Sequence, residues 1–191
     1  TMGPWNAALM FVEDLKNENI LHQVDKLYVD LYGSLALTGN GHGTDVALVL
    51  GLSGYYPKTV PQKTIRNLPL QIKENRFLTL SKLHTVNFSM EEHIRFHRNK
   101  TLEYHPNGMT ISAFNAKEKK LYEATYFSVG GGFVVQENQK DNTSTVTIPY
   151  PIKTAEDIKK HCEASNQNIA WIVRENEKFL GTENDVNKKI V

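Results

Sequence analysis

The segment VDKLYVDLYGSLALTGNGHGTDVALVLGL, residues 24–52, decides the fold that we expect for this chain. Apolar side chains alternate with polar ones in its first part, which predicts a half-buried strand over 24–31. The apolar run in its last part predicts a helix over 46–55, which ends near Pro57. The expected order is therefore strand, glycine-rich loop, helix.

The loop between these two elements has the features of a ligand site. Its sequence is GNGHG, residues 39–43, with His42 between two glycines. Glycines let the backbone take positive φ and approach a ligand, and the next helix start offers free N–H groups to an anion. The alternative is a tight turn in which Thr44 or Asp45 caps the helix. A dinucleotide site is not predicted, because the G-x-G-x-x-G spacing is absent.

Apolar periodicity predicts the other elements before residue 150. Helices are expected over residues 1–20, 64–77 and 89–98, the last of which begins at a Ser-Met-Glu-Glu cap. Strands are expected over 77–87, 110–115, 121–129 and 145–148, the second and third of which form a hairpin. A solvated loop is expected over 136–144. The triplet Gly130–Gly132 predicts a bulge, a sharp turn or a close backbone approach.

A domain boundary is expected at Pro149–Pro151. We therefore expect one domain over 1–150 and the start of a second over 151–191. In the second, Thr154 and Asp157 have the spacing of a capping box, and two short helices come after it. These helices have little apolar surface to bury alone. Since the chain also begins without an initiating methionine, we expect it to be cut from a longer protein.

Composition narrows the class of protein. The chain has 191 residues, 22 basic and 21 acidic, with a formal net charge of +1. This balance gives no basic field for nucleic acid or an anionic membrane. Cys162 is the one cysteine, so no internal disulfide can form, and we expect it to be a small buried residue rather than a nucleophile. No leading signal peptide and no apolar run of about 18 residues occurs, so a cytoplasmic protein is expected.

Three further histidines are candidates for chemistry. His105 lies in a Tyr-His-Pro-Asn-Gly turn, residues 104–108, where an imidazole is held either for chemistry or only for the turn. His93 and His97 have the spacing of two metal ligands on one helical face. Glu92 precedes the first of them, so the zinc-protease order H-E-x-x-H is absent, and a solvated face is the favoured interpretation.

Four segments in order resemble one family, the iron-sulfur L-serine dehydratases, which are bacterial L-serine ammonia-lyases. They are TMGPWNAALMFVEDL (1–15), VDLYGSLALTGNGHGTDVALVLGLSG (29–54), YHPNGMTISAFN (104–115) and YFSVGGGFV (126–134). The resemblance covers roughly residues 1–150. Thr1-Met2-Gly3-Pro4 resembles the end of the family motif Ser-Ser-His-Thr-x-Gly-Pro. Residues after Pro151 resemble the start of the family's cluster-binding domain.

The resemblance implies an α+β fold, with a mixed or antiparallel sheet and helices packed on it, similar to the allosteric substrate-binding domain of some phosphoglycerate dehydrogenases. It also implies a helical α domain that holds a 4Fe-4S cluster on three cysteines and converts L-serine to pyruvate and ammonia, in amino-acid catabolism and gluconeogenesis. The implied catalytic residues are His42 and His105, and loop geometry favours the same pair. The implied substrate-binding residues are Thr1, Gly41, Gly43, Thr44 and Asn107.

One departure from the family concerns the cofactor. Three thiolates are needed for the cluster, whereas Cys162 is the only cysteine and does not match a cluster position. We therefore expect no cluster in this chain and no activity from it alone. It would complete the active site beside its own α domain and contribute contacts to a homodimer. A regulatory module that binds a small amino acid or an anion is the second hypothesis, and a dimerisation scaffold is the third.

Overall fold

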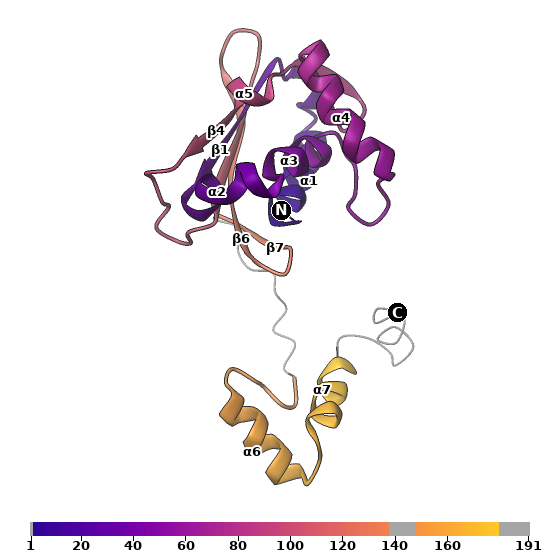
Figure 1. The fold of residues 1–191 in the computed structure, drawn as a ribbon, viewed down its shortest axis with the longest axis vertical. Coiled ribbons are helices and arrows are strands. Elements are labelled where there is room, and N and C mark those ends of the chain that lie inside the picture. Colours follow the sequence, from indigo (N-terminus) through magenta and orange to yellow (C-terminus); the bar gives the residue numbers. More distant parts are fainter. Residues whose placement is uncertain (1, 138–147, 180–191) are drawn as a thin grey trace. The chain divides into compact units, whose positions relative to one another are not determined.

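The computed structural model describes residues 2–137 and 148–179, and the chain divides into two compact units, Thr1–Gln139 and Lys140–Val191 (Figure 1). The strand expected over 145–148 and most of the loop expected over 136–144 lie outside the described residues.

The first unit is built on a five-stranded mixed sheet with the strand order β4-β1-β5-β6-β7. Strand β1 pairs parallel with β4 and antiparallel with β5, and the other pairs are antiparallel. This sheet, with helices packed on it, confirms the expected α+β class. The strands are β1 (Lys26–Tyr32), β4 (Ile94–His97), β5 (Gly108–Phe114), β6 (Lys120–Gly130) and β7 (Phe133–Gln136).

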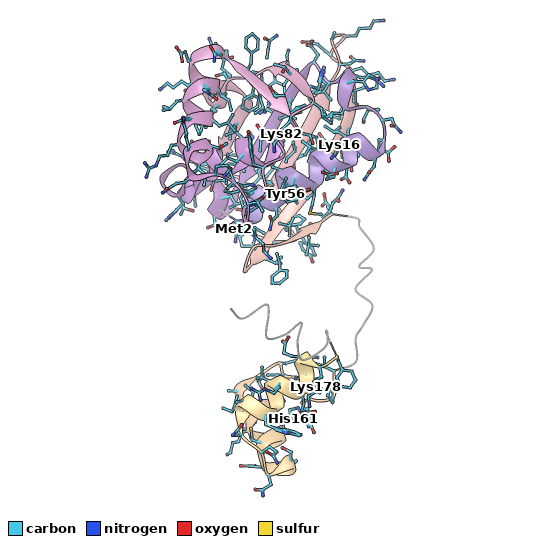
Figure 2. The ribbon with its side chains drawn as sticks, turned by 90° about the vertical axis from the view of Figure 1, so that its right-hand side faces the viewer. Met2, Lys16, Tyr56, Lys82, His161 and Lys178 are labelled. Carbon is cyan, nitrogen blue, oxygen red and sulfur yellow. The ribbon has the colours of Figure 1, made fainter. Side chains whose placement is uncertain are left out.

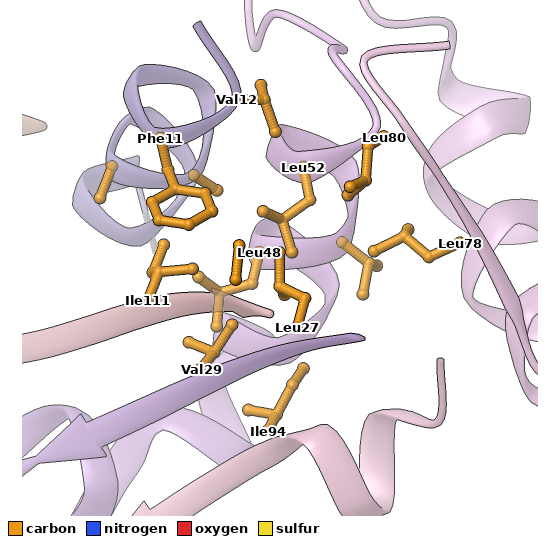
Figure 3. Packing of buried hydrophobic residues seen from close by; sticks show 14 of the residues in the cluster. Phe11, Val12, Leu27, Val29, Leu48, Leu52, Leu78, Leu80, Ile94 and Ile111 are labelled. Carbon is orange, nitrogen blue, oxygen red and sulfur yellow. The ribbon is translucent and has the colours of Figure 1, made fainter. Parts of the chain in front are cut away.

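Three helices lie on one side of the sheet (Figure 1). They are α1 (Met2–Asn17), α3 (Thr44–Leu52) and α4 (Gln62–Asn75), and a short 3-10 helix, η1 (Leu21–Gln23), connects α1 to β1. The core between helices and sheet is fully buried and purely apolar where Phe11, Leu48 and Leu52 meet Val29 and Ile111 (Figure 3). Burial of such side chains is the main force that holds the layers together.

Helices α1 and α3 cross closely because the crossing residue is a glycine. A Cβ on Gly51 would lie 2.5 Å from the Trp5 carbonyl oxygen and 2.7 Å from the Ala8 Cβ. No side chain fits in that space. The Trp5 indole N–H also donates to the Tyr55 carbonyl oxygen at 2.6 Å, which ties α1 to the segment after α3.

The helix expected over 89–98 is wrong in its second half. The structure has a single helical turn, α5 (Met90–His93), and β4 begins directly after it. Ile94 is buried and pairs with Val29 of β1, while Arg95 lies on the opposite face of the sheet and is exposed. The alternation between the two faces of the sheet extends over only four residues in this segment. Pairing with a distant strand therefore decides its structure.

The single strand expected over 77–87 is a hairpin instead. Strands β2 (Phe77–Leu80) and β3 (His84–Asn87) pair with each other as a separate two-stranded sheet. The backbone reverses at Ser81 and Lys82, whose φ angles are 48° and 60°. Neither residue is a usual turn former for these angles, so the amino-acid pattern contains no turn signal here.

The glycine-rich loop is largely helical. Helix α2 (Gly33–Thr38) lies directly before the GNGHG segment. The 3-10 helix η2 (Gly39–His42) contains all of that segment except Gly43. Helix α3 starts at Thr44 and ends at Leu52, rather than spanning 46–55. Its N-cap is Gly43, with a φ of 65° and no capping side chain, so neither Thr44 nor Asp45 is the N-cap of the alternative interpretation. Glycine fits this left-handed position without strain. The Asp45 carboxylate does accept from the Val46 N–H in the first turn, at 2.9 Å.

The second unit contains two helices, α6 (Ala155–Ser165) and α7 (Ile169–Glu177). The expected capping box is present: the Thr154 hydroxyl accepts from the Asp157 N–H, and the Asp157 carboxylate accepts from the Thr154 N–H. The side chain of Asn176 bonds both backbone groups of Tyr150, at 2.9 and 2.7 Å. Within 2–137 and 148–179, no helix is long and apolar enough to span a membrane.

Candidate functional site

The segment that carries His105 is fixed against the N-terminus of α2. The Ser34 N–H donates to the Pro106 carbonyl oxygen at 3.0 Å, and the Gly33 N–H donates to the Lys100 carbonyl oxygen at 2.8 Å. Gly33 has a φ of 50°, and a Cβ on it would lie 2.2 Å from the Pro106 oxygen. Only glycine therefore allows this contact between α2 and the turn.

The tautomer of neutral His105 is set by its hydrogen bond to the backbone. The Asn107 N–H donates to the His105 Nδ1 at 3.1 Å. Because a backbone N–H can only donate, Nδ1 is the acceptor, and the ring proton of the neutral imidazole is on Nε2. The ring is half-buried. His105 is therefore set up to donate a hydrogen bond from Nε2.

Asn107 and the first turn of α1 meet at Ser128, near the end of β6. The Asn107 side-chain amide donates to the Ser128 carbonyl oxygen at 3.3 Å, and the Ser128 N–H donates back to the Asn107 carbonyl oxygen at 3.0 Å. Gly3 of α1 lies directly against this residue, because a Cβ on Gly3 would be 2.0 Å from the Ser128 Oγ. The positive end of the α1 dipole thus lies beside Asn107, which favours an anionic group there.

The triplet of glycines forms the turn between β6 and β7, which is one of the three outcomes expected for it. The φ angles of Gly130, Gly131 and Gly132 are 102°, 58° and 83°, all in the region that favours glycine. The Asn6 side-chain amide donates to the Gly132 carbonyl oxygen at 2.8 Å, so the turn is tied to α1. Sequence reasoning assigned no role to Asn6 or Ser128. Their signal was their position within segments 1–15 and 126–134.

His42 lies at the other end of α2, in η2, and its side chain is exposed. Helix α2 is about 9 Å long, and η2 follows it directly, so both elements lie between the segment that carries His105 and the position of His42. A Cβ on Gly41 or Gly43 would meet no described atom within 4 Å, which leaves open space beside the backbone. Both loops therefore flank α2.

The remaining predicted substrate-binding residues are placed differently. Thr44 is only 2 % exposed, and its side chain packs against Gly39 in the first turn of α3. Thr1 lies outside the described residues. A cavity of about 430 Å³ adjoins the start of α3, where Asp45, Val46 and Phe96 line it.

The single helical face that carries His93 and His97, favoured as a solvated face with two metal ligands as the alternative, is wrong, because the helix that would align them ends at His93. The His93 ring is stacked between Tyr28 and Phe88, at centroid distances of 5.2 and 5.1 Å, and burial lowers its pKa below 6.5. In residues 2–137 and 148–179, no group of three His, Cys, Asp or Glu side chains is placed to hold a metal ion. Cys162 is partly rather than fully buried, which corrects the expected buried position.

His97 instead belongs to a cluster around Asp30 on the outer face of the sheet. The carboxylate of Asp30, 7 % exposed, accepts from the Arg95 guanidinium and from the His97 Nε2, both at 2.5 Å. Tyr32 stacks on the His97 ring at 5.1 Å. These contacts join the end of β4 to β1 where the segment leading to His105 begins. An acidic residue inside the apolar alternation of β1 was the only sequence signal for this cluster.

Comparison with known proteins gives the family and close relatives. The family described as serine dehydratase beta chain matches residues 1–139. The L-serine dehydratase of Haemophilus influenzae is 41 % identical over 180 residues, which cover 93 % of this chain and 39 % of that protein. L-serine dehydratase 1 of Escherichia coli is 37 % identical over 191 residues, covering 98 % and 42 %. The L-serine dehydratase of Streptomyces coelicolor is 35 % identical over 195 residues, covering 100 % and 43 %. The chain thus spans about two fifths of the length of these relatives.

Proposed function

Because the chain belongs to the serine dehydratase beta-chain family, we propose that it is the β domain, with the first helices of an α domain, of an L-serine dehydratase. The whole enzyme would convert L-serine to pyruvate and ammonia in the cytoplasm. The observation that carries this proposal is the match over nearly the whole chain to proteins named L-serine dehydratase.

A 4Fe-4S cluster is the cofactor that we expect for such an enzyme, and the residues of this chain do not fit it. The cluster needs several thiolates, whereas the 191 residues contain one cysteine, Cys162. Its ligands would therefore come from residues outside this chain, in the proposed α domain. We accordingly expect no turnover from this chain alone.

The contribution of this chain would be to bind L-serine and to supply a hydrogen-bond donor. The substrate carboxylate would bind at the N-terminus of α1, beside Asn107, where the helix dipole and the free N–H groups favour an anion. His105 would donate a hydrogen bond from Nε2 to the hydroxyl of L-serine, which stabilises the negative charge that develops on this oxygen as its bond to carbon breaks. The alternative, with the same carboxylate position, is donation to the carboxylate itself.

His42, with Gly41 and Gly43 beside it, would take part from the other end of α2. Removal of the α proton needs a base, and a neutral imidazole is suited to this role near pH 7. The open backbone at the two glycines would let the amino acid come close to the ring. The domain would also contribute contacts to the α domain and to a homodimer.

A regulatory module is the second candidate function. It would bind a small amino acid or an anion at the same loops without chemistry, and the lack of cluster thiolates in this chain favours it. Anaerobic iron-sulfur reconstitution distinguishes the two functions. The longer gene product and the 191-residue chain are treated in parallel, and pyruvate release from L-serine is measured with the visible absorbance of the cluster.

Turnover and a cluster in the longer protein alone would support the dehydratase. In that protein, His42→Ala should then abolish turnover without loss of the fold. Unchanged turnover with a lost response to added L-serine would support the regulatory module instead. Turnover by the 191-residue chain alone would contradict the role proposed for it.

A further inference from the structure

A cavity of about 500 Å³ lies between α4 and the β2–β3 hairpin. The residues that line it include neither His42 nor His105, so it is separate from the candidate site at α2. Part of its wall is apolar and consists of Leu68 and Ile72 of α4 and Phe77 of β2. The uncharged polar residues of the lining include Gln71, Asn75, Thr79 and Thr85. A volume of this size is typical of sites for small organic ligands.

One residue that lines the cavity, Ser53, has a buried hydroxyl without a described hydrogen-bond partner. Ser53, at the end of α3, is 3 % exposed, and its Oγ has no partner among the residues that the structure describes. Buried hydroxyls in folded proteins nearly always have a partner. The exception is explained if a ligand or a ligand-bound water completes the bonding of Ser53.

Lys82, which lines the cavity, lies in a turn with an unfavourable backbone conformation. Ser81 and Lys82 both have positive φ, at 48° and 60°, in a turn where asparagine and glycine are preferred. The Ser81 N–H donates to the Leu52 carbonyl oxygen at 2.8 Å, which fixes the turn on the end of α3. The Lys82 Nζ then lies 4.2 Å from the centroid of the Tyr55 ring, and both residues line the cavity. Figure 2 labels Lys82 among the side chains of the first unit. Such strain is often retained where it serves a site.

The charges of the lining residues specify the ligand. Lys82 is the one cation among the residues that line the cavity, and none of them is Asp or Glu. An anionic group would therefore find a partner, whereas an ammonium group would find no carboxylate. The apolar walls at Leu68, Ile72 and Phe77 suit a hydrocarbon body. We propose that this cavity binds an organic monocarboxylate with an apolar body, and that it rejects the corresponding amino acid.

Titration of the 191-residue chain with hydrocinnamate tests the proposal, with amide chemical shifts followed by NMR. Phenylalanine is the matched control, since it is hydrocinnamate with an added ammonium group. We expect saturable shifts centred on Ser53, Tyr55 and Lys82, with a Kd on the order of 1 mM. Phenylalanine should cause none at the same concentration.

Two variants then locate the binding groups. Lys82→Gln removes the charge from an exposed turn and should weaken hydrocinnamate binding about tenfold. Lys58→Gln removes an exposed lysine that does not line the cavity and should leave Kd within about twofold. Ser53→Ala should weaken binding about threefold without loss of the fold, because its hydroxyl has no described partner.

The absence of saturable shifts up to about 20 mM would overturn the proposal. Equal binding of phenylalanine would overturn the charge argument on which it rests, and so would an unchanged Kd in Lys82→Gln. Since the readout is binding and not turnover, the result is independent of the function proposed above.

Discussion

Asn107 and Ser128 exchange two hydrogen bonds, one through the backbone N–H of Ser128 and one through the side-chain amide of Asn107. Each residue has a further contact, since the Asn107 N–H donates to His105 and Ser128 packs against Gly3. The pair therefore connects the turn that carries His105 with the first turn of α1. Separate segments of the chain form one site because this connection is made.

Gly3→Ala should disturb this connection. The new Cβ would lie 2.0 Å from the Ser128 Oγ and 2.5 Å from its Cβ, so one of the two elements must move. We expect the free energy of unfolding to fall by about 2–3 kcal/mol in urea denaturation. Ser128→Gly in the same chain should recover much of the loss. Gly41→Ala is the control, because open space surrounds that position, and an equal loss there would contradict the steric explanation.

The tautomer of His105 leads to a test of its role. If Nε2 donates to the substrate, glutamine retains more activity than asparagine, since the amide nitrogen of glutamine reaches the position of Nε2. In the reconstituted longer protein, we expect His105→Asn to lower kcat/KM about 100-fold or more and His105→Gln to lower it less. Higher activity in His105→Asn than in His105→Gln would point to Nδ1 as the reacting atom. It would contradict the conclusion that the hydrogen bond from Asn107 fixes the ring proton on Nε2.

The hairpin from β5 to β6 could be predicted from sequence, whereas β4 could not. Between Gly108 and Gly130 the apolar alternation is long and the partner strand is the next one along the chain, so local pattern and pairing agree. Strand β4 has four residues and pairs with β1, which lies 65 residues earlier at the Val29–Ile94 pair. Ser89 is the N-cap residue of α5, but its side chain makes no capping hydrogen bond. Only one helical turn follows it, and the distant pairing with β1 makes the next four residues a strand.

The candidate site shows the same division between local and distant information. The turn at residues 104–108 was expected to hold an imidazole, and the bond between Asn107 and His105 is local. The contacts with Ser128 and Gly3 come from segments 21 and 104 residues away from Asn107, as 128 − 107 and 107 − 3 give. The periodicity of apolar residues carries no information on contacts between such distant segments. The sequence could therefore predict the loop but not the contacts that fix it in place.

A change at Ser81 and Lys82 that weakens ligand binding should increase the free energy of unfolding of the first unit. Replacing Ser81-Lys82 with Asn-Gly puts residues that tolerate positive φ at both positions, and we expect about 1–2 kcal/mol more stability in urea denaturation. The same variant lacks the amine beside Tyr55 and should bind hydrocinnamate about tenfold more weakly, as Lys82→Gln does. Asn19→Gly, at a φ of 56°, is the control and should change stability little, because asparagine already accepts this conformation.

Because of His93, the free energy of unfolding of the first unit should decrease as the pH falls. Burial between Tyr28 and Phe88 lowers its pKa, and the nearby Lys26 and Arg76 charges act in the same direction. The unfolded chain therefore binds a proton below pH 6.5 before the folded chain does, so stability is lost as the pH drops through 6.5 and the loss is complete below the folded pKa.

Titration of the His93 ring by NMR should give a pKa below 6.5. His93→Gln should flatten the fall in unfolding free energy between about pH 7 and pH 5, whereas His22→Gln, which removes an exposed histidine, should not. A normal His93 pKa, or an unchanged slope in His93→Gln, would show that the stacked ring is freely solvated.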